Sequence, residues 1–237
     1  LPVVVKAVGC TGVSFEAPLV EIAPTQGPPC RYGRVQPDAA DAILMNHFGA
    51  PRPGRRLGRA ASRLLEELVT GESDDPVVRH GIDLGSGHGA AYWGRQHHIV
   101  MQHCGELDPL DLEDYRAHGG FDALKRCADG FPPEDVVTTV YDSGLRGRGG
   151  AGFPTGKKWR TVREAPGEAR YLVCNGDEGD PGSFMDRMIL ESFPFRVIEG
   201  MAIAAATVGA QEGIFYIRAE YPLAVQRVVE AIRLCEE

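Results

Sequence analysis

The chain has 237 residues, of which 43% are hydrophobic and 24% charged, and its formal net charge at pH 7 is -8. This composition is typical of a soluble globular protein, and the acidic net charge argues against a general nucleic-acid binder, which would show a basic face. No run of about 18 apolar residues occurs, so we expect no membrane span. The cysteines lie far apart without a C-x-x-C pair. That spacing is typical of a reducing compartment, so we expect a cytoplasmic protein.

The first region, residues 1–48, is predicted to form half of a small α/β unit. The run LPVVVKAVGC is an expected strand, and a second β-rich run follows after a turn that contains proline. Asp38 is placed to cap a helix in which Ile43 and Phe48 stand at helical spacing. Residues 49–96 then become rich in proline, glycine and charge, with one amphipathic helix expected at 59–69. This composition is typical of a linker.

Residues 97–237 have the pattern of a globular domain. Strands are expected at HIVMQHCG, YLVCN and GIFYIRAE. Helices are expected from Asp108 or Asp111, over PPEDVVTTVYDSG, around 157–163, after GDEGDPGSF, over PFRVIEGMAIAAATVGA and over YPLAVQRVVEAIRLCEE. Because helices and strands alternate, the pattern favours an α/β fold with parallel strand pairing.

A glycine-rich stretch, GLRGRGGAGFPTGKKW at residues 144–159, is the first candidate site. Its bare backbone would let a flat or anionic ligand approach closely, and Lys157 and Lys158 add positive charge near a helix N-terminus. A P-loop is excluded, because Ala151 stands where its first glycine is required. The letters G-x-G-x-x-G also occur, but the Phe153-Pro154 break disfavours a Rossmann turn. A mobile surface loop remains the alternative.

An acidic segment, CNGDEGDPGSFMDR at residues 174–187, is the second candidate site. It places Asn175, Asp177 and Glu178 at the carboxyl end of a predicted strand, where open α/β sheets usually bind ligands. Carboxylates would repel a phosphate, so these side chains are expected to accept hydrogen bonds from ligand hydroxyl or ring N–H groups. A solvated acidic turn is the alternative for either segment alone.

Taken together with VIEGMAIAAATVGA and FYIRAEYP, these motifs resemble the NADH-binding flavoprotein subunit of respiratory complex I, NAD(P)-linked hydrogenases and formate dehydrogenases. The resemblance covers about residues 99–237. It implies a subunit that passes a hydride between NAD(H) and a bound FMN and then sends single electrons to iron-sulfur clusters.

The resemblance also implies a role for individual residues. Gly147, Gly149 and Gly150 would form the wall against which the flavin and nicotinamide rings stack, within a cofactor-binding stretch that also holds Arg148, Ala151 and Gly152. Phe153 would contact the adenine of NAD, and Lys158 the FMN phosphate or ring edge. Asn175, Asp177 and Glu178 would bind FMN, with Glu178 also near the nicotinamide as the catalytic candidate, and Asp180 near the NAD ribose.

Residues 1–48 resemble the second half of a thioredoxin-like 2Fe-2S domain. Cys10 is present, but its cysteine partner in that family is replaced by Ser14, so we expect no cluster and a structural thiol. The loop and the asparagine pair that complete the FMN pocket in the family, and its 4Fe-4S cysteines, do not occur in this chain. We expect the 4Fe-4S cluster only in a missing C-terminal part or a partner chain. No histidine and cysteine spacing predicts another metal site.

The sequence therefore predicts an α/β protein with an incomplete Rossmann-like FMN/NAD-binding domain at 97–237, preceded by a thioredoxin-like remnant at 1–48 and a linker at 49–96. Its expected function is the diaphorase subunit of an NAD(P)-dependent formate dehydrogenase or hydrogenase. The expected partners are the iron-sulfur and catalytic subunits of a multisubunit redox complex. The alternatives are the flavoprotein subunit of complex I and a truncated, non-catalytic scaffold subunit.

Overall fold

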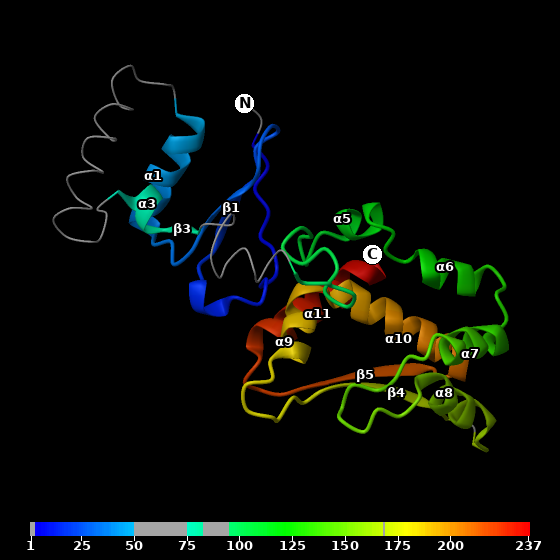
Figure 1. The fold of residues 1–237 in the computed structure, drawn as a ribbon. Helices are drawn as coiled ribbons and strands as arrows, with labels where there is room; N and C mark the ends of the chain where they lie inside the picture. The colour runs from blue at the N-terminus through cyan, green and yellow to red at the C-terminus, as the bar shows by residue number, and fades with distance from the viewer. Residues whose placement is uncertain (1–2, 50–74, 83–94, 168) are drawn as a thin grey trace. The chain divides into compact units, whose positions relative to one another are not determined.

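A computed structural model describes residues 3–49, 75–82, 95–167 and 169–237 of the chain (Figure 1). It divides into two compact units, one formed by Gly12–His98 and the other by Leu1–Thr11 together with Ile99–Glu237. The helix expected at 59–69 and most of the expected linker lie outside the described residues. The domain boundaries at 48 and 96 stay predictions.

The smaller unit is a three-stranded antiparallel sheet with helices. Its strands β1 (Val20–Ile22), β2 (Cys30–Tyr32) and β3 (Gly81–Ile82) pair in the order β1-β2-β3. A short 3-10 helix (Ser14–Glu16), α1 (Pro37–Phe48) and α3 (Pro76–Arg79) complete its described part. Helix α1 begins after Gln36 with proline at its first position, so Asp38 lies in the first turn and is not the cap that we predicted.

The larger unit holds both candidate sites. Its elements, in chain order, are α5 (Leu112–Ala117), α6 (Asp122–Ala128), α7 (Pro133–Asp142), α8 (Thr155–Glu164), β4 (Tyr171–Gly176), α9 (Met185–Ser192), α10 (Pro194–Val208), β5 (Glu212–Ile217) and α11 (Pro222–Glu236). Asp111 caps α5 by accepting a hydrogen bond from the backbone N–H of Asp114 at 2.9 Å. Of the two caps that the sequence allowed, Asp108 and Asp111, it is the one that the structure shows. Among the described residues, no helix is long and apolar enough to span a bilayer.

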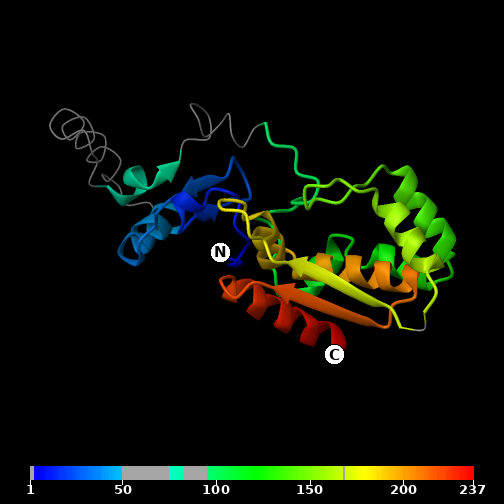
Figure 2. The ribbon, with the colours of Figure 1, turned by 90° about the horizontal axis from the view of Figure 1, so that it is seen from below.

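Strands β4 and β5 pair in parallel, which confirms the pairing expected from the alternation of helices and strands. Their register runs from Tyr171 opposite Glu212 to Gly176 opposite Ile217, and α9 and α10 form the crossover between them. Helix α10 contacts both strands and ends at Gly209, which takes the left-handed conformation at φ 75°. Figure 2 shows the strand pair from below.

The core of this unit forms where α9, α10 and α11 meet. One cluster of buried side chains contains Met101, Leu107, Tyr115, Phe193, Phe195 and Ala231, and another contains Leu190, Tyr221, Ala224 and Val228. Helices α10 and α11 therefore build the platform that carries the β4–β5 pair. The buried side of α11 is formed by Ala224, Val228 and Ala231, whereas Leu223 and Val225, which the sequence pattern places on the apolar side, are exposed.

Two predicted strands are wrong. Residues 3–10 belong to no strand, and neither do residues 98–105, which are turns from residue 100 onward. In the second segment Cys104 N–H donates to the carbonyl of Met101 at 3.0 Å, and His103 and Gly105 have positive φ angles. A short apolar run does not distinguish a strand from a buried turn, and here the turn buries Met101 against the core.

Candidate functional site

The glycine-rich stretch connects α7 to α8, and its last glycine is a packing residue. A Cβ at Gly156 would lie 2.5 Å from the backbone nitrogen of Tyr141 in α7. No side chain fits at that distance, so Gly156 lets the two helices approach each other. The space beside Gly156 is therefore filled by α7. The part of the glycine-rich stretch that is open to a ligand lies upstream of it.

That upstream part is a loop that is closed only at its base. Gly147 N–H donates to the carbonyl of Phe153 at 2.9 Å, and Thr155 N–H donates to the carbonyl of Leu145 at 2.9 Å. The guanidinium of Arg146 donates to the carbonyl of Gly152 at 3.0 Å. Two backbone hydrogen bonds and one side-chain bond thus fix where the loop begins and ends.

The tip of the loop presents bare backbone. An added Cβ at Gly149, Gly150 or Gly152 would meet nothing within 4 Å. Gly150 and Gly152 also have φ angles of 94° and 60°, which side-chain-bearing residues rarely adopt. The tip of the loop therefore leaves its main chain open, with no neighbouring atom where a side chain would lie.

The side chains around this tip are exposed and mostly positive. The ring of Phe153 is half exposed, and the ammonium of Lys157 lies 5.8 Å from its centroid. Arg148 and Lys158 are exposed, and within the described part of the chain neither makes a side-chain hydrogen bond or ion pair. These charges are available to an anionic group.

The acidic loop follows β4, and three of its predicted site residues are exposed. Asn175 accepts a hydrogen bond from the backbone N–H of Asp177 at 3.0 Å, which bends the chain as it leaves the strand. Asn175 pairs in register with Tyr216 on the exposed face of the sheet. Asp177 and Asp180 are also exposed. Their side chains can therefore reach a ligand at the carboxyl end of β4.

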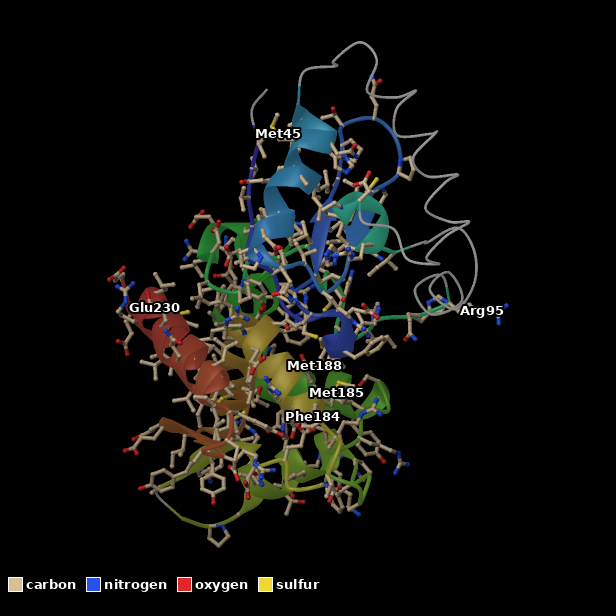
Figure 3. The ribbon with its side chains drawn as sticks, turned by 90° about the vertical axis from the view of Figure 1, so that its left-hand side faces the viewer. Met45, Arg95, Phe184, Met185, Met188 and Glu230 are labelled. Carbon is tan, nitrogen blue, oxygen red and sulfur yellow. The ribbon has the colours of Figure 1, made fainter. Side chains whose placement is uncertain are left out.

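Glu178 differs from these three, because its side chain is only 8% exposed. Its carboxylate accepts hydrogen bonds from the Ser183 hydroxyl at 2.6 Å and from the Met185 N–H at 2.7 Å. The N–H groups of Asp186 and Arg187 donate to it at 3.1 and 3.3 Å. These amides are the first N–H groups of α9, which have no partner inside the helix. The Glu178 carboxylate thus caps the first turn of α9, which begins after Phe184. Figure 3 labels Phe184, Met185 and Met188 at this helix.

This cap also determines the charge of the carboxylate. Burial raises the pKa of Glu178, but the hydrogen bonds from Ser183 and from the backbone of Asp186, Arg187 and Met185 outweigh burial and hold the pKa below its usual value. An ionised carboxylate at the positive end of the α9 dipole is stabilising. The structure thus gives Glu178 a structural part that the sequence analysis missed, and its predicted contact with the cofactor stays a prediction.

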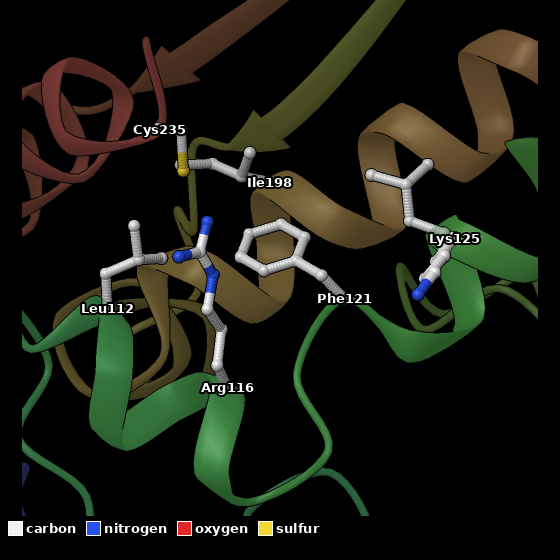
Figure 4. Close-up of a pocket in the computed structure, with 7 residues that line it drawn as sticks. Leu112, Arg116, Phe121, Lys125, Ile198 and Cys235 are labelled. Carbon is white, nitrogen blue, oxygen red and sulfur yellow. The ribbon is translucent and has the colours of Figure 1, made fainter. Parts of the chain in front are cut away.

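The two loops belong to one compact unit but are not bonded to each other. Among the described residues, no hydrogen bond or ion pair joins residues 144–154 to residues 175–183. A pocket of about 350 Å³ lies elsewhere, where α5, α6, α10 and α11 meet (Figure 4). Its lining comprises Leu112, Arg116, Phe121, Leu124, Lys125, Ile198 and Cys235, which include no predicted site residue.

Comparison with known proteins points to the same part of the chain. Residues 140–237, which include both loops, match the Nuo51 FMN-binding domain. The chain is 48% identical over 139 residues to a subunit of the NADH-quinone oxidoreductase of Rhizobium meliloti, a match that covers 59% of this chain and 33% of the relative. It is 49% identical over 138 residues to the HndC subunit of the NADP-reducing hydrogenase of Solidesulfovibrio fructosivorans, covering 58% and 28% of the two chains.

A third relative is the alpha subunit of the NAD-reducing hydrogenase HoxS of Cupriavidus necator, 55% identical over 89 residues, with 38% of this chain and 15% of the relative covered. The chain thus spans a third or less of the length of these relatives. The part of the chain that matches the Nuo51 FMN-binding domain thus resembles the NADH-binding FMN subunits of complex I and of NAD-linked hydrogenases.

Proposed function

We propose that the chain is the FMN- and NAD-binding part of a diaphorase subunit, which passes a hydride between NAD(H) and FMN and then electrons to iron-sulfur clusters. The match of residues 140–237 to an FMN-binding domain, across both candidate loops, carries this proposal. An NAD(P)-dependent hydrogenase or formate dehydrogenase is the favoured complex, with iron-sulfur and catalytic subunits as partners. The flavoprotein subunit of complex I is the second candidate, because a subunit of NADH-quinone oxidoreductase is among the relatives.

The residues of the two loops fit such cofactors. The open backbone at Gly149 and Gly150 can lie flat against a ring system, since nothing occupies the space a side chain would take. Lys158 can meet a phosphate or a polar ring edge, and the exposed carboxylates of Asp177 and Asp180 can accept hydrogen bonds from ribityl or ribose hydroxyls. The flavin supplies the hydride chemistry, and these side chains bind and orient it.

The exposed face of the β4–β5 pair supports a site that is completed by further polypeptide. Tyr171 and Val173 are 57% and 55% exposed, and Ile214 and Tyr216 of β5 are 46% and 58% exposed on the same face. Parallel sheets are ordinarily covered on both faces. We propose that additional chain, in the same subunit or a partner, covers this face, extends the sheet toward a Rossmann-like domain and holds the 4Fe-4S cluster.

Two finer proposals concern the rest of the chain. Residues 1–48 are proposed to derive from a thioredoxin-like domain that has lost its cluster, since Ser14 replaces the second cysteine of the pair. Among the described residues no disulfide bond joins any of the cysteines, Cys10 included. The spacing of the cysteines supports a reducing, cytoplasmic compartment as a proposal.

Anaerobic reconstitution with FMN, followed by titration with NADH, tests the proposed function. Bleaching of the flavin absorbance by NADH is the expected result. If the chain retained no FMN even with its partner chains present, the enzyme proposal would be wrong and the non-catalytic scaffold would be favoured.

A further inference from the structure

The segment that follows β5 holds the acidic loop that follows β4. The guanidinium of Arg218 donates a hydrogen bond to the backbone carbonyl of Glu178, and its remaining nitrogens bond the carboxylate of Glu220 at 3.0 and 3.2 Å. The Arg218 side chain is thus fixed between a charged partner on its own segment and the main chain of the acidic loop. It ties the carboxyl ends of β4 and β5 together.

Tyr221 reaches the same residue from the start of α11. It is 6% exposed, and its hydroxyl donates to the carboxylate of Glu178 at 3.3 Å. The Arg218 and Arg187 guanidiniums lie 5.4 and 5.7 Å from its ring centroid. Glu178 is therefore held at its carbonyl by Arg218 and at its carboxylate by Tyr221 as well as by the first turn of α9.

The geometry points to Arg218 and Tyr221 as positioning residues for the cofactor site. By fixing Glu178 they fix the loop on either side of it, and so hold the exposed side chains of Asn175, Asp177 and Asp180 at the sheet edge. This inference rests on the proposed function, because those three side chains are the ones expected to face the flavin and the dinucleotide. Neither Arg218 nor Tyr221 is among the residues expected to contact a cofactor.

The chain contains a second network of the same kind, which serves as a matched control. Glu199 is 9% exposed and accepts hydrogen bonds from the Tyr115 hydroxyl at 2.5 Å and from the Phe121 N–H at 2.9 Å. Helix α6 begins after Phe121 at φ 64°, as α9 begins after Phe184 at φ 58°. No predicted site residue lies in this second network. Tyr115→Phe therefore removes the same group as Tyr221→Phe at a place remote from the site in sequence.

The experiment compares Arg218→Gln, Arg218→Lys, Tyr221→Phe and Tyr115→Phe in the full 237-residue chain. Hydrogen exchange of peptides covering 175–187 is measured without flavin, and the FMN dissociation constant is measured by flavin fluorescence. We expect Arg218→Gln to speed exchange in these peptides and to raise the dissociation constant about tenfold, the equivalent of one lost hydrogen bond. Arg218→Lys keeps a donor for the Glu178 carbonyl and should recover most of the loss.

Tyr221→Phe should have the same effect as Arg218→Gln to a smaller degree, and it carries the test if Arg218→Gln does not fold. Tyr115→Phe should speed exchange only around residues 119–128 and leave FMN binding unchanged. If peptides covering 175–187 exchanged at the wild-type rate in both Arg218→Gln and Tyr221→Phe, the inference would be overturned. An equal loss of FMN binding in Tyr115→Phe would also overturn it, because the effect would then be one of general stability.

The two proposals fail separately. If the wild-type chain bound no FMN even with its partner chains present, the proposed function would be wrong, while the exchange measurement would still decide whether Arg218 and Tyr221 hold the acidic loop.

Discussion

The glycine-rich loop and the acidic loop differ in what surrounds them. The tip of the first is bare, and an added Cβ at Gly149 would meet no atom within 4 Å. The second contains the carboxylate of Glu178, which is nearly buried and accepts hydrogen bonds from a hydroxyl of the same loop, from the first turn of α9 and from Tyr221. One loop therefore offers unoccupied surface to a ligand, whereas the other offers a backbone that the protein holds in place, with exposed side chains on either side of the fixed point. The proposed flavin site would use both properties, the open main chain and the fixed polar side chains.

Substitution of Glu178 is expected to have the largest effect on stability, and it tests whether the acidic loop is held as this comparison says. Glu178→Ala leaves the first amides of α9 and the Tyr221 hydroxyl without their partner, so we expect the free energy of unfolding to fall by about 2–4 kcal/mol. Chemical denaturation monitored by circular dichroism measures it. Asp177→Ala, at the exposed neighbouring position, is the control and should change stability by less than about 0.5 kcal/mol. Equal stability of the two variants would contradict the assignment of Glu178 as the cap.

A second, smaller effect separates two kinds of glycine within one stretch. Gly156→Ala places a methyl group against the backbone of Tyr141, so we expect a loss of about 1–3 kcal/mol in the free energy of unfolding. Gly149→Ala has open space and should leave stability within about 0.5 kcal/mol of wild type while weakening FMN binding. Thermal unfolding and FMN titration of both variants measure this. A destabilised Gly149→Ala with normal FMN binding would show that the loop tip is structural.

The smallest effect concerns pH. Because the folded state holds the pKa of Glu178 below its ordinary value of 4.5, the carboxylate contributes stability that is fully present above that value and is lost as pH falls through the lowered pKa. The free energy of unfolding of the wild type should therefore approach that of Glu178→Gln as pH decreases below about 4.5. Denaturation curves between neutral and acid pH measure the difference. A gap that stayed constant over this range would mean that Glu178 does not titrate with a lowered pKa.

Elements with a clear periodicity and a stop signal could be predicted from the sequence. Helices α7, α10 and α11 each have proline in the first turn, and α10 ends at Gly209. Strands β4 and β5 stand in the sequence as short apolar runs between helices, and their parallel pairing follows from that alternation. The short run at 98–105 gives a wrong prediction, because its length and composition suit a strand and a buried turn equally.

The tertiary roles within the candidate site could not be predicted. Gly156 and Gly149 look alike in sequence, and only the packing of α8 on α7 separates them. Glu178 lies seven residues before Met185, too far for a local capping pattern, so its role as a cap depends on the path of the intervening loop. The hydrogen bond from Arg218 to the carbonyl of Glu178 joins residues that are forty positions apart in the chain, so no local pattern predicts it.

The central claim is that the two loops together bind the flavin. Hydrogen exchange of the wild-type chain with and without FMN tests this claim most directly. The account predicts slower exchange on FMN addition in peptides covering 147–153 and 175–180, with no change in peptides covering 119–128 around the Glu199 network. Unchanged exchange in both loops at saturating FMN, or protection of only one of them, would contradict it.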